Sequence, residues 1–275
     1  MILLDGRKLS KKILSGLKED FSRLNKKLRL AVVVVGEDPA IRKFIAQKKK
    51  AAKNLGVDFK IYLFPENIST NELRQRLAYI NHEPKNTGVI IQLPLSKHIN
   101  TQYILNSITP EKDVDMLSSR AGGNFASGKS RTLPPVVGAI STLLEEYKID
   151  LKNKNIVIVG AGGLVGKPTS IWLLHQKIGF QLVEANTPHP EEIIKKADIL
   201  ITGIGSPGYI KGDWVKDGVV VIDAGTSESE NKLTGDVDFA SVSSKASYIT
   251  PVPGGVGPLT VAMLFKNLLI LTNSK

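Results

Sequence analysis

The chain has 275 residues, of which 42% are hydrophobic, and it carries a formal net charge of +11 at pH 7. That length suits one large α/β domain or two ordinary ones, and the hydrophobic content is typical of a globular protein. The absence of cysteine excludes disulfides and thiol chemistry, the four histidines lack metal-ligand spacing, and the chain has no run of about eighteen apolar residues that could span a membrane.

Basic residues are spread along the whole chain rather than gathered in one arm. Without an RNA-binding aromatic motif or a helix-turn-helix pattern, this charge favours a small polyanionic ligand, or plain solubility, over nucleic acid. The first residues, MILLDGRKLSKKIL, become charged after four positions, which is atypical of a signal peptide. We therefore expect a cytoplasmic protein with no nucleic-acid partner, no membrane partner and no metal site.

Helix-like and strand-like patterns alternate along the first half of the chain, which predicts an open parallel sheet covered by helices. The strands are expected at residues 28–36, 59–64 and 88–95, and the helices at residues 9–25, 38–55 and 71–80. One of these helices is unusual in its charge pattern. At 100° per residue, Lys48 falls in the middle of the apolar face of helix 38–55, which comprises Ile41, Phe44, Ile45, Ala52 and Leu55.

A charged amine among core-facing residues is costly unless its head reaches water or a partner. Lys48 is therefore either a lysine that snorkels to solvent or a functional one, and the helix pattern leaves both open. A lysine that is desolvated in this way can have its pKa lowered toward neutrality, which suits proton transfer.

The second half of the chain predicts a mononucleotide-binding unit. Before it, the Gly-, Ser- and Arg-rich residues 118–135 are predicted to be a loop that faces a cleft. The elements expected beyond are a helix from Val136, strands at 155–160, 180–184, 198–202, 219–223 and 247–250, a helix at 165–176 and a last apolar helix at 259–271. We predict an α/β protein with two open domains, residues 1–135 and 136–257, and a cleft between them. The second is of Rossmann type, and the helix at 258–273 is expected to pack back on the first.

The segment VIVGAGGLVGKP, residues 157–168, joins a buried strand to a helix through glycines. Such a turn lets backbone N–H groups approach a pyrophosphate, although a purely structural turn has the same pattern. Glu184 ends the next strand, 22 residues after Gly162. An acidic side chain there hydrogen-bonds a ribose 2′-hydroxyl and repels a 2′-phosphate, which favours NAD over NADP, unless Glu184 is only a solvated loop residue. Pro207 and Gly208 follow the third strand, where a loop would border the nicotinamide end of such a site.

Three further segments carry candidate site residues. Gln92 lies in the apolar segment VIIQLPL, and a buried amide needs hydrogen-bond partners. Asp113 and Asp115 share a face if their segment is extended, although ordinary turn aspartates look the same. The segment PVPGGVGPLT, residues 251–260, is rigid and leaves its backbone open to a ligand.

These residues resemble the methylenetetrahydrofolate dehydrogenase/cyclohydrolase family of one-carbon metabolism. The resemblance covers nearly the whole chain, and its segments stand in the family's order. They are VGEDPA with Lys48, GVIIQLPL, TPEKDVD, the VGKP end of the glycine turn, GSPGYIKGDWVKDGVVVID, GDVDF and YITPVPGGVGPLTVAML, of which the last is highly specific.

The resemblance implies a homodimer that oxidises methylenetetrahydrofolate to the methenyl cation by hydride transfer to NAD or NADP, and then hydrolyses that cation to formyltetrahydrofolate. It implies that Lys48 is the lysine of the cyclohydrolase step, that Gln92 hydrogen-bonds near it and that Asp115 holds the pterin ring. The implied folate pocket contains Phe44, Pro253, Gly254 and Gly255. The implied dinucleotide-binding residues are Gly160, Ala161, Gly162, Gly163, Val165, Gly166, Pro168, Glu184, Gly205 and Pro207.

Several positions depart from the family pattern. Phe44, one helical turn before Lys48, stands where the family has a tyrosine, and Met116 stands where it has a glycine. The family's Pro-Cys-Thr-Pro segment is residues 134–137 here, Pro-Pro-Val-Val, and its turn serine is Gly162. The positions that are often basic or histidine near a 2′-phosphate are Ala161, Glu184 and Ala185. Glu184 thus favours NAD, whereas the family favours NADP.

Two alternatives stay open at this point. The departures at Phe44 and at residues 134–137 are also those expected of a divergent paralogue that binds folate or nucleotide with one activity or none. A two-domain dehydrogenase of the shikimate or amino-acid type would share the architecture, but the segment PVPGGVGP argues against it.

Overall fold

The computed structural model describes residues 1–24, 26–229 and 232–273. It divides into two compact α/β units, as the sequence predicts. The lysine-helix unit comprises Lys11–Pro135 and Val261–Lys275, and the glycine-turn unit comprises Met1–Ser10 and Val136–Thr260. The division into functional domains at residues 1–135 and 136–257 stays a prediction.

The lysine-helix unit is built on three parallel strands in the order β3-β2-β4. Its predicted elements are all present within a few residues of their expected bounds. The strands are β2 (Arg29–Val35), β3 (Asp58–Phe64) and β4 (Gly88–Ile91), and the helices are α2 (Pro39–Leu55), α3 (Thr70–His82), α4 (Thr101–Leu105) and α5 (Ser119–Ala126), with most of α1 (Gly6–Ser22) and α10 (Val256–Thr272).

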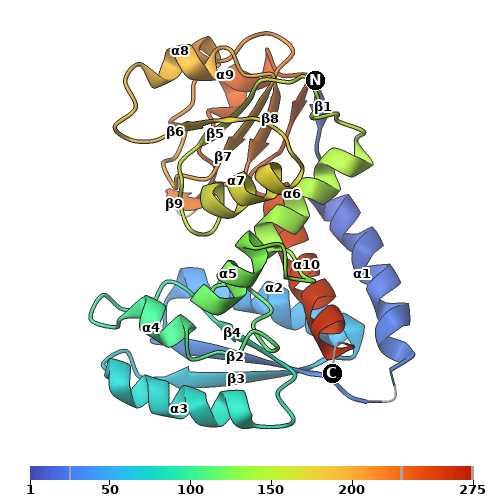
Figure 1. Cartoon of the computed structure of the whole chain (residues 1–275), viewed down its shortest axis with the longest axis vertical. Coiled ribbons are helices and arrows are strands. Elements are labelled where there is room, and N and C mark those ends of the chain that lie inside the picture. Colours follow the sequence, from blue (N-terminus) through green and yellow to red (C-terminus); the bar gives the residue numbers. More distant parts are fainter. Residues whose placement is uncertain (25, 230–231, 274–275) are drawn as a thin grey trace. The chain divides into compact units, whose positions relative to one another are not determined.

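Both faces of this sheet are buried, which explains the unbroken run of valines in β2. Val32 and Val34 face a core formed with α1, α2 and α10, whereas Val33 and Val35 face a second core formed with α3 and α4. Figure 1 shows α2 and α10 on one side of the sheet and α3 on the other. The buried face of α2 is thereby held against β2.

The predicted loop at residues 118–135 is partly wrong, because it contains helix α5. Ser118 caps this helix, since its side chain accepts a hydrogen bond from Ala121 N. Ala121 and Phe125 are buried on its inner face. Two apolar anchors and a cap are sufficient for a helix of two turns, although the composition resembles a loop.

The glycine-turn unit is built on six parallel strands in the order β1-β11-β8-β7-β5-β6. The strands are β1 (Ile2–Leu3), β5 (Ile156–Val159), β6 (Gln181–Val183), β7 (Ile199–Thr202), β8 (Val220–Asp223) and β11 (Tyr248–Ile249), and β9 (Ser227–Ser229) and β10 (Lys232–Thr234) form a separate hairpin. The helices are α6 (Pro135–Glu146), α7 (Gly166–His175), α8 (Pro190–Ile194), the 3-10 helix η1 (Gly212–Trp214) and α9 (Phe239–Ser243). β6 and β7 flank β5 on opposite sides, so the order reverses there, where parallel sheets bind nucleotides.

The sequence missed several short elements of both units. They are β1, β9, β10, α4, α8, α9 and η1, none of which exceeds five residues. Periodicity needs more residues than these elements have. Among the described residues, no helix is both long and apolar enough to cross a membrane.

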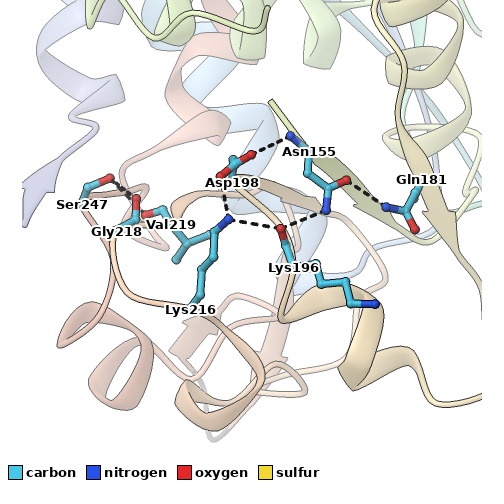
Figure 2. Close-up of polar contacts among 8 residues, drawn as sticks. All are labelled: Asn155, Gln181, Lys196, Asp198, Lys216, Gly218, Val219 and Ser247. Carbon is cyan, nitrogen blue, oxygen red and sulfur yellow. Dashed lines mark hydrogen bonds and ion pairs between the residues drawn. The ribbon is translucent and has the colours of Figure 1, made fainter. Parts of the chain in front are cut away.

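At the amino ends of the strands, polar side chains tie β5, β7 and the segment before β8 together (Figure 2). Lys216 Nζ lies 2.6 Å from Asp198 Oδ1 and donates to Lys196 O, while Asn155 N donates to Asp198 Oδ2 at 2.7 Å. The hydrogen bond from Lys216 holds the pKa of Asp198 below its usual value. This network fixes the amino ends of these strands, at the end of the sheet opposite their carboxyl ends.

Candidate active site

Lys48 lies in the middle of the buried face of α2, between Ile45 and Ala52, and only 9% of its surface is exposed. The other basic residues of the helix are exposed: Arg42, Lys43, Lys49, Lys50 and Lys53. Lys48 Nζ donates a hydrogen bond of 2.8 Å to Gln92 Oε1. The lysine is therefore a buried amine with a protein partner rather than one that snorkels to solvent.

Gln92 is the first residue after β4, and its backbone N donates to Val33 O at 2.9 Å. Its side chain is also fixed at both ends, because Nε2 donates to Leu93 O at 2.8 Å while Oε1 accepts from Lys48. The carbonyl of Leu93 can only accept, so it fixes Nε2 of the amide toward itself and Oε1 toward the amine of Lys48. Gln92 satisfies one N–H of the amine without adding a charge.

Asp115 completes the electrostatics of this site. Burial raises the pKa of its carboxyl to about 6, the Lys48 charge opposes that rise, and the nearby Asp113 adds to it. Burial in turn lowers the pKa of the Lys48 amine, and the Asp115 carboxylate opposes that shift. The structure thus brings together Lys48, Gln92 and Asp115, which lie far apart in the sequence.

Asp113 has a different role from Asp115, although the two were expected to share a face. Its buried carboxylate accepts hydrogen bonds from Ser118 N at 2.9 Å and Leu117 N at 3.3 Å. Between the two aspartates and these donors, Met116 has a φ of +58°, a conformation that favours glycine. Asp113 holds this strained turn closed and so places Asp115.

Phe44 lies one turn before Lys48 on α2 and is half-buried rather than part of the core, although the pattern placed it on the apolar face. A ring that is partly open to solvent is free to stack on a ligand, but it brings no hydroxyl to the amine of Lys48.

The glycine turn of the other unit, residues 160–166, joins β5 to α7. Gly160 has a φ of +86°, which favours glycine, and Gly162 and Gly163 form an exposed tip without side chains. The exposed backbone of Gly162 and Gly163, which precedes a ten-residue helix, allows a close approach by an anionic ligand, so this turn fits the pyrophosphate of a dinucleotide. Three of the residues that the resemblance assigns to dinucleotide binding are buried behind this exposed tip: Val165, Gly166 and Pro168.

Glu184 follows β6, and its carboxylate accepts a hydrogen bond from Ala161 N in the glycine turn. Its own backbone N donates to Thr187 Oγ1 at 2.8 Å. The side chain is exposed but held beside the turn, where the ribose of a dinucleotide lies in such units.

Pro253, Gly254 and Gly255 lie in a loop between β11 and α10. Gly255 N donates to Pro251 O at 2.7 Å, and Arg7 N donates to Gly254 O at 3.1 Å. Gly6 has no space for a side chain, because the carbonyl of Gly255 lies against it. The start of the chain thus fixes this loop, which belongs to the glycine-turn unit, whereas Lys48 belongs to the other.

Two buried carboxylates of the glycine-turn unit were missed by the sequence patterns. Asp223 ends β8, and Asp236 follows β10; 3% and 0% of their surfaces are exposed. The available signals were the end of the apolar strand VVVID and the segment GDVDF, where an acid between apolar residues must find buried partners.

Comparison with known proteins matches both units to one family. Residues 4–115 match the catalytic domain of the tetrahydrofolate dehydrogenase/cyclohydrolases, and residues 134–275 match the NAD(P)-binding domain of the same enzymes. The chain belongs to the tetrahydrofolate dehydrogenase/cyclohydrolase family. The resemblance that the sequence motifs indicate is therefore confirmed, as is the fold of two α/β units, one of them of Rossmann type.

Individual members of the family cover the chain from end to end. The bifunctional protein FolD of Nautilia profundicola is 44% identical over 97% of this chain and 95% of its own length. The crystal structure of the bifunctional enzyme FolD from Campylobacter jejuni covers 100% of this chain and 99% of its own, with 38% identity and a TM-score of 0.94. The Trypanosoma brucei FolD structure, complexed with NADP and an inhibitor, covers 100% and 98%, with 31% identity and a TM-score of 0.94.

Membership of the tetrahydrofolate dehydrogenase/cyclohydrolases makes the chain an enzyme with both activities of that family. It acts on folate substrates and uses a nicotinamide dinucleotide. No comparison favours the alternative of a non-catalytic or single-activity paralogue, and the shikimate-type alternative is replaced by the family match.

Proposed function

We propose that Lys48 is the proton-transfer group of the cyclohydrolase step and that Gln92 and Asp115 set its geometry and charge. The observation that carries this assignment is the 2.8 Å hydrogen bond from the buried Lys48 Nζ to Gln92 Oε1. Desolvation lowers the pKa of this buried amine, so a larger fraction of it is neutral than in an exposed lysine, and the neutral form can take a proton.

In the hydrolysis, the oxygen of water forms a bond to the methenyl carbon, and Lys48 Nζ takes the proton that this water loses. One carbon–nitrogen bond then breaks, Lys48 returns the proton to the leaving nitrogen, and the new hydroxyl releases its proton to solvent as the formyl carbonyl forms. Gln92 keeps the amine in place throughout, because it accepts one N–H and cannot itself be protonated.

Asp115 is the residue that we assign to the pterin ring. Its carboxylate, with a pKa of about 6, is charged near neutral pH, when it can accept hydrogen bonds from ring N–H groups. Phe44, half-buried one turn before Lys48, is assigned to stack against the same substrate. Pro253, Gly254 and Gly255 complete this assignment as the folate loop of the glycine-turn unit.

The dinucleotide is assigned to the glycine turn, with its pyrophosphate at residues 160–166 and its nicotinamide end toward Gly205 and Pro207, which are exposed on the loop after β7. When bound, the dinucleotide supplies the hydride acceptor. The protein's own part is to orient the two rings and hold them in contact, which is the main requirement of hydride transfer.

We further propose that Glu184 favours NAD over NADP. Its carboxylate is held beside the turn by Ala161 N, where it can accept from a ribose 2′-hydroxyl and repel a 2′-phosphate. The proposal also includes a homodimer, which the family resemblance implies, and a cytoplasmic location. Light scattering on the purified chain tests the homodimer directly.

The test of the two activities uses the purified full chain in two separate assays. The first follows the absorbance of reduced nicotinamide while methylenetetrahydrofolate is oxidised with NAD or NADP. The second follows the loss of methenyltetrahydrofolate without any dinucleotide. We expect turnover in both assays, and its absence from the second would contradict the role proposed for Lys48.

A further inference from the structure

The loop after β7, residues 203–210, is held by one buried carboxylate. Asp236 Oδ2 accepts hydrogen bonds from Ile204 N at 2.7 Å and from Thr202 Oγ1 at 2.9 Å, and its Oδ1 accepts from Ser206 N at 2.9 Å. No part of the Asp236 surface is exposed. Two donors from the loop and one from the end of β7 therefore converge on a side chain that lies more than twenty-five residues further along the chain.

The backbone around Asp236 holds the rest of the same loop. Gly208 N donates to Gly235 O at 3.0 Å, Ile210 N donates to Asp236 O at 3.0 Å, and Asp238 N donates back to Ile210 O at 2.9 Å. Residues 235–238 thus form a template segment, which holds the loop by hydrogen bonds at several points along its length.

The template is itself fixed to the sheet through Asp223 at the end of β8. Asp223 Oδ2 accepts from Val237 N at 3.0 Å, and its Oδ1 accepts from Gly225 N at 2.9 Å. Burial, with a smaller effect from the Asp236 carboxylate, raises the pKa of Asp223 to about 7. The segment therefore has little freedom to move relative to β7 and β8.

The loop packs directly against the glycine turn. A side chain at Gly160 would meet Ile204 Cγ2 at 2.5 Å, and one at Gly203 would meet Val165 Cβ at 2.5 Å. Each segment thus occupies the space that the other leaves by having a glycine. A shift of Ile204 would be transmitted to Gly160, because protein interiors are close-packed and leave little empty space to absorb it.

We propose that Asp236 is a positioning residue of the dehydrogenase. It fixes the loop that contains Gly205 and Pro207 in its packing against the glycine turn. It touches neither cofactor nor substrate. It acts through the backbone N–H groups of Ile204 and Ser206. This inference rests on the proposed assignment of the dinucleotide to the glycine turn and to this loop.

The decisive variant is Asp236→Asn, because an amide is of the same size but can accept at only one of its two ends. With its oxygen toward Ile204 N and Thr202 Oγ1, its NH₂ group opposes Ser206 N. The matched control is Asp238→Asn, which removes a carboxylate two residues away whose Oδ2 accepts from Ser241 Oγ at 2.8 Å. Dinucleotide binding is measured by calorimetry, and both activities are measured on the full chain.

We expect Asp236→Asn to weaken dinucleotide binding and raise its KM by about tenfold, as for a buried donor left unpaired. Asp238→Asn should stay within about twofold of the wild type, and hydrolysis of supplied methenyltetrahydrofolate, which needs no dinucleotide, should stay within about twofold in both variants. Thr202→Val removes one donor without changing the size of the side chain. It should give a smaller increase in KM, and it keeps the test available if Asp236→Asn does not fold.

Unchanged dinucleotide affinity in both Asp236→Asn and Thr202→Val would overturn the inference, as would an equal loss of the two activities, which indicates a general loss of structure. If the wild type itself binds no dinucleotide, the proposed function fails rather than this inference alone.

Discussion

Lys48 Nζ lies 2.8 Å from Gln92 Oε1, and both side chains are more than nine-tenths buried. The amide accepts one hydrogen bond from the amine without contributing a negative charge. A carboxylate in its place would stabilise the ammonium form, whereas an apolar side chain would leave a buried donor unpaired. The pair therefore favours a lysine that is held in position and yet can lose its proton.

The first prediction concerns the charge of that partner. Gln92→Glu places a carboxylate on the amine and should raise the pKa of Lys48, so that less neutral amine is present at pH 7. We expect the cyclohydrolase kcat at pH 7 to fall about tenfold or more and the pH profile to shift to higher pH. Gln47→Glu, at the exposed neighbouring position on α2, is the control and should change neither. A Gln92→Glu profile identical to that of the wild type would contradict the assignment.

The second prediction concerns the acid side of the pH profile. Because the pKa of Asp115 is raised to about 6, its carboxyl is neutral below that pH and charged above it. The charged form is the one that we assign to the pterin ring, so kcat/KM for the folate substrate should fall as the pH decreases through about 6. Asp115→Asn should have low residual activity without this fall. An unchanged acid limb in the variant would assign the titration to another group.

The third prediction tests cofactor choice. Glu184→Gln removes the negative charge beside the 2′ position but keeps an oxygen that can accept from Ala161 N. We expect the ratio of kcat/KM for NADP to that for NAD to rise about fivefold, because a repulsion of roughly 1 kcal/mol is removed. Steady-state kinetics with both dinucleotides measure this ratio. Glu192→Gln on α8 is the control, since it removes a carboxylate from the same unit away from the turn.

The fourth prediction concerns Phe44. Phe44→Tyr places a hydroxyl one helical turn from Lys48, where it can hydrogen-bond the amine or a water next to it. A hydrogen bond to a charged or buried group contributes about 1 to 3 kcal/mol, so the cyclohydrolase rate should rise several-fold, with the dehydrogenase rate little changed. Parallel assays of the two activities check this. A lower rate in the first assay would show that the apolar ring suits this site better than a phenol.

The sequence was sufficient to predict the elements that have a clear period. The apolar stripe of α2 and the valine run of β2 predict their own burial, and Lys48 was identified because it interrupts such a stripe. The family motifs then added the roles of Gln92 and Asp115, which the structure places beside it.

Other parts of the site could not be predicted, because they depend on contacts between distant segments. In the sequence, Asp113 is equivalent to Asp115. In the structure, its carboxylate accepts hydrogen bonds from Leu117 N and Ser118 N and holds the turn at Met116. The only local signal of Asp236 is its position in the segment GDVDF, and its partners could not be predicted because they come from the end of β7 and the loop that follows, about thirty residues earlier. Helix α5 was missed because its cap and two apolar anchors lie within a composition typical of loops.

The most direct test of the central claim is the pair of variants Lys48→Met and Lys49→Met, assayed for hydrolysis of methenyltetrahydrofolate and, separately, for oxidation of methylenetetrahydrofolate. The two lysines are adjacent on α2, but Lys48 is buried against Gln92 and Lys49 is exposed. We predict that Lys48→Met loses about 10²- to 10⁴-fold in hydrolysis while hydride transfer stays measurable, and that Lys49→Met resembles the wild type in both assays. Hydrolysis at the wild-type rate in Lys48→Met would contradict the account.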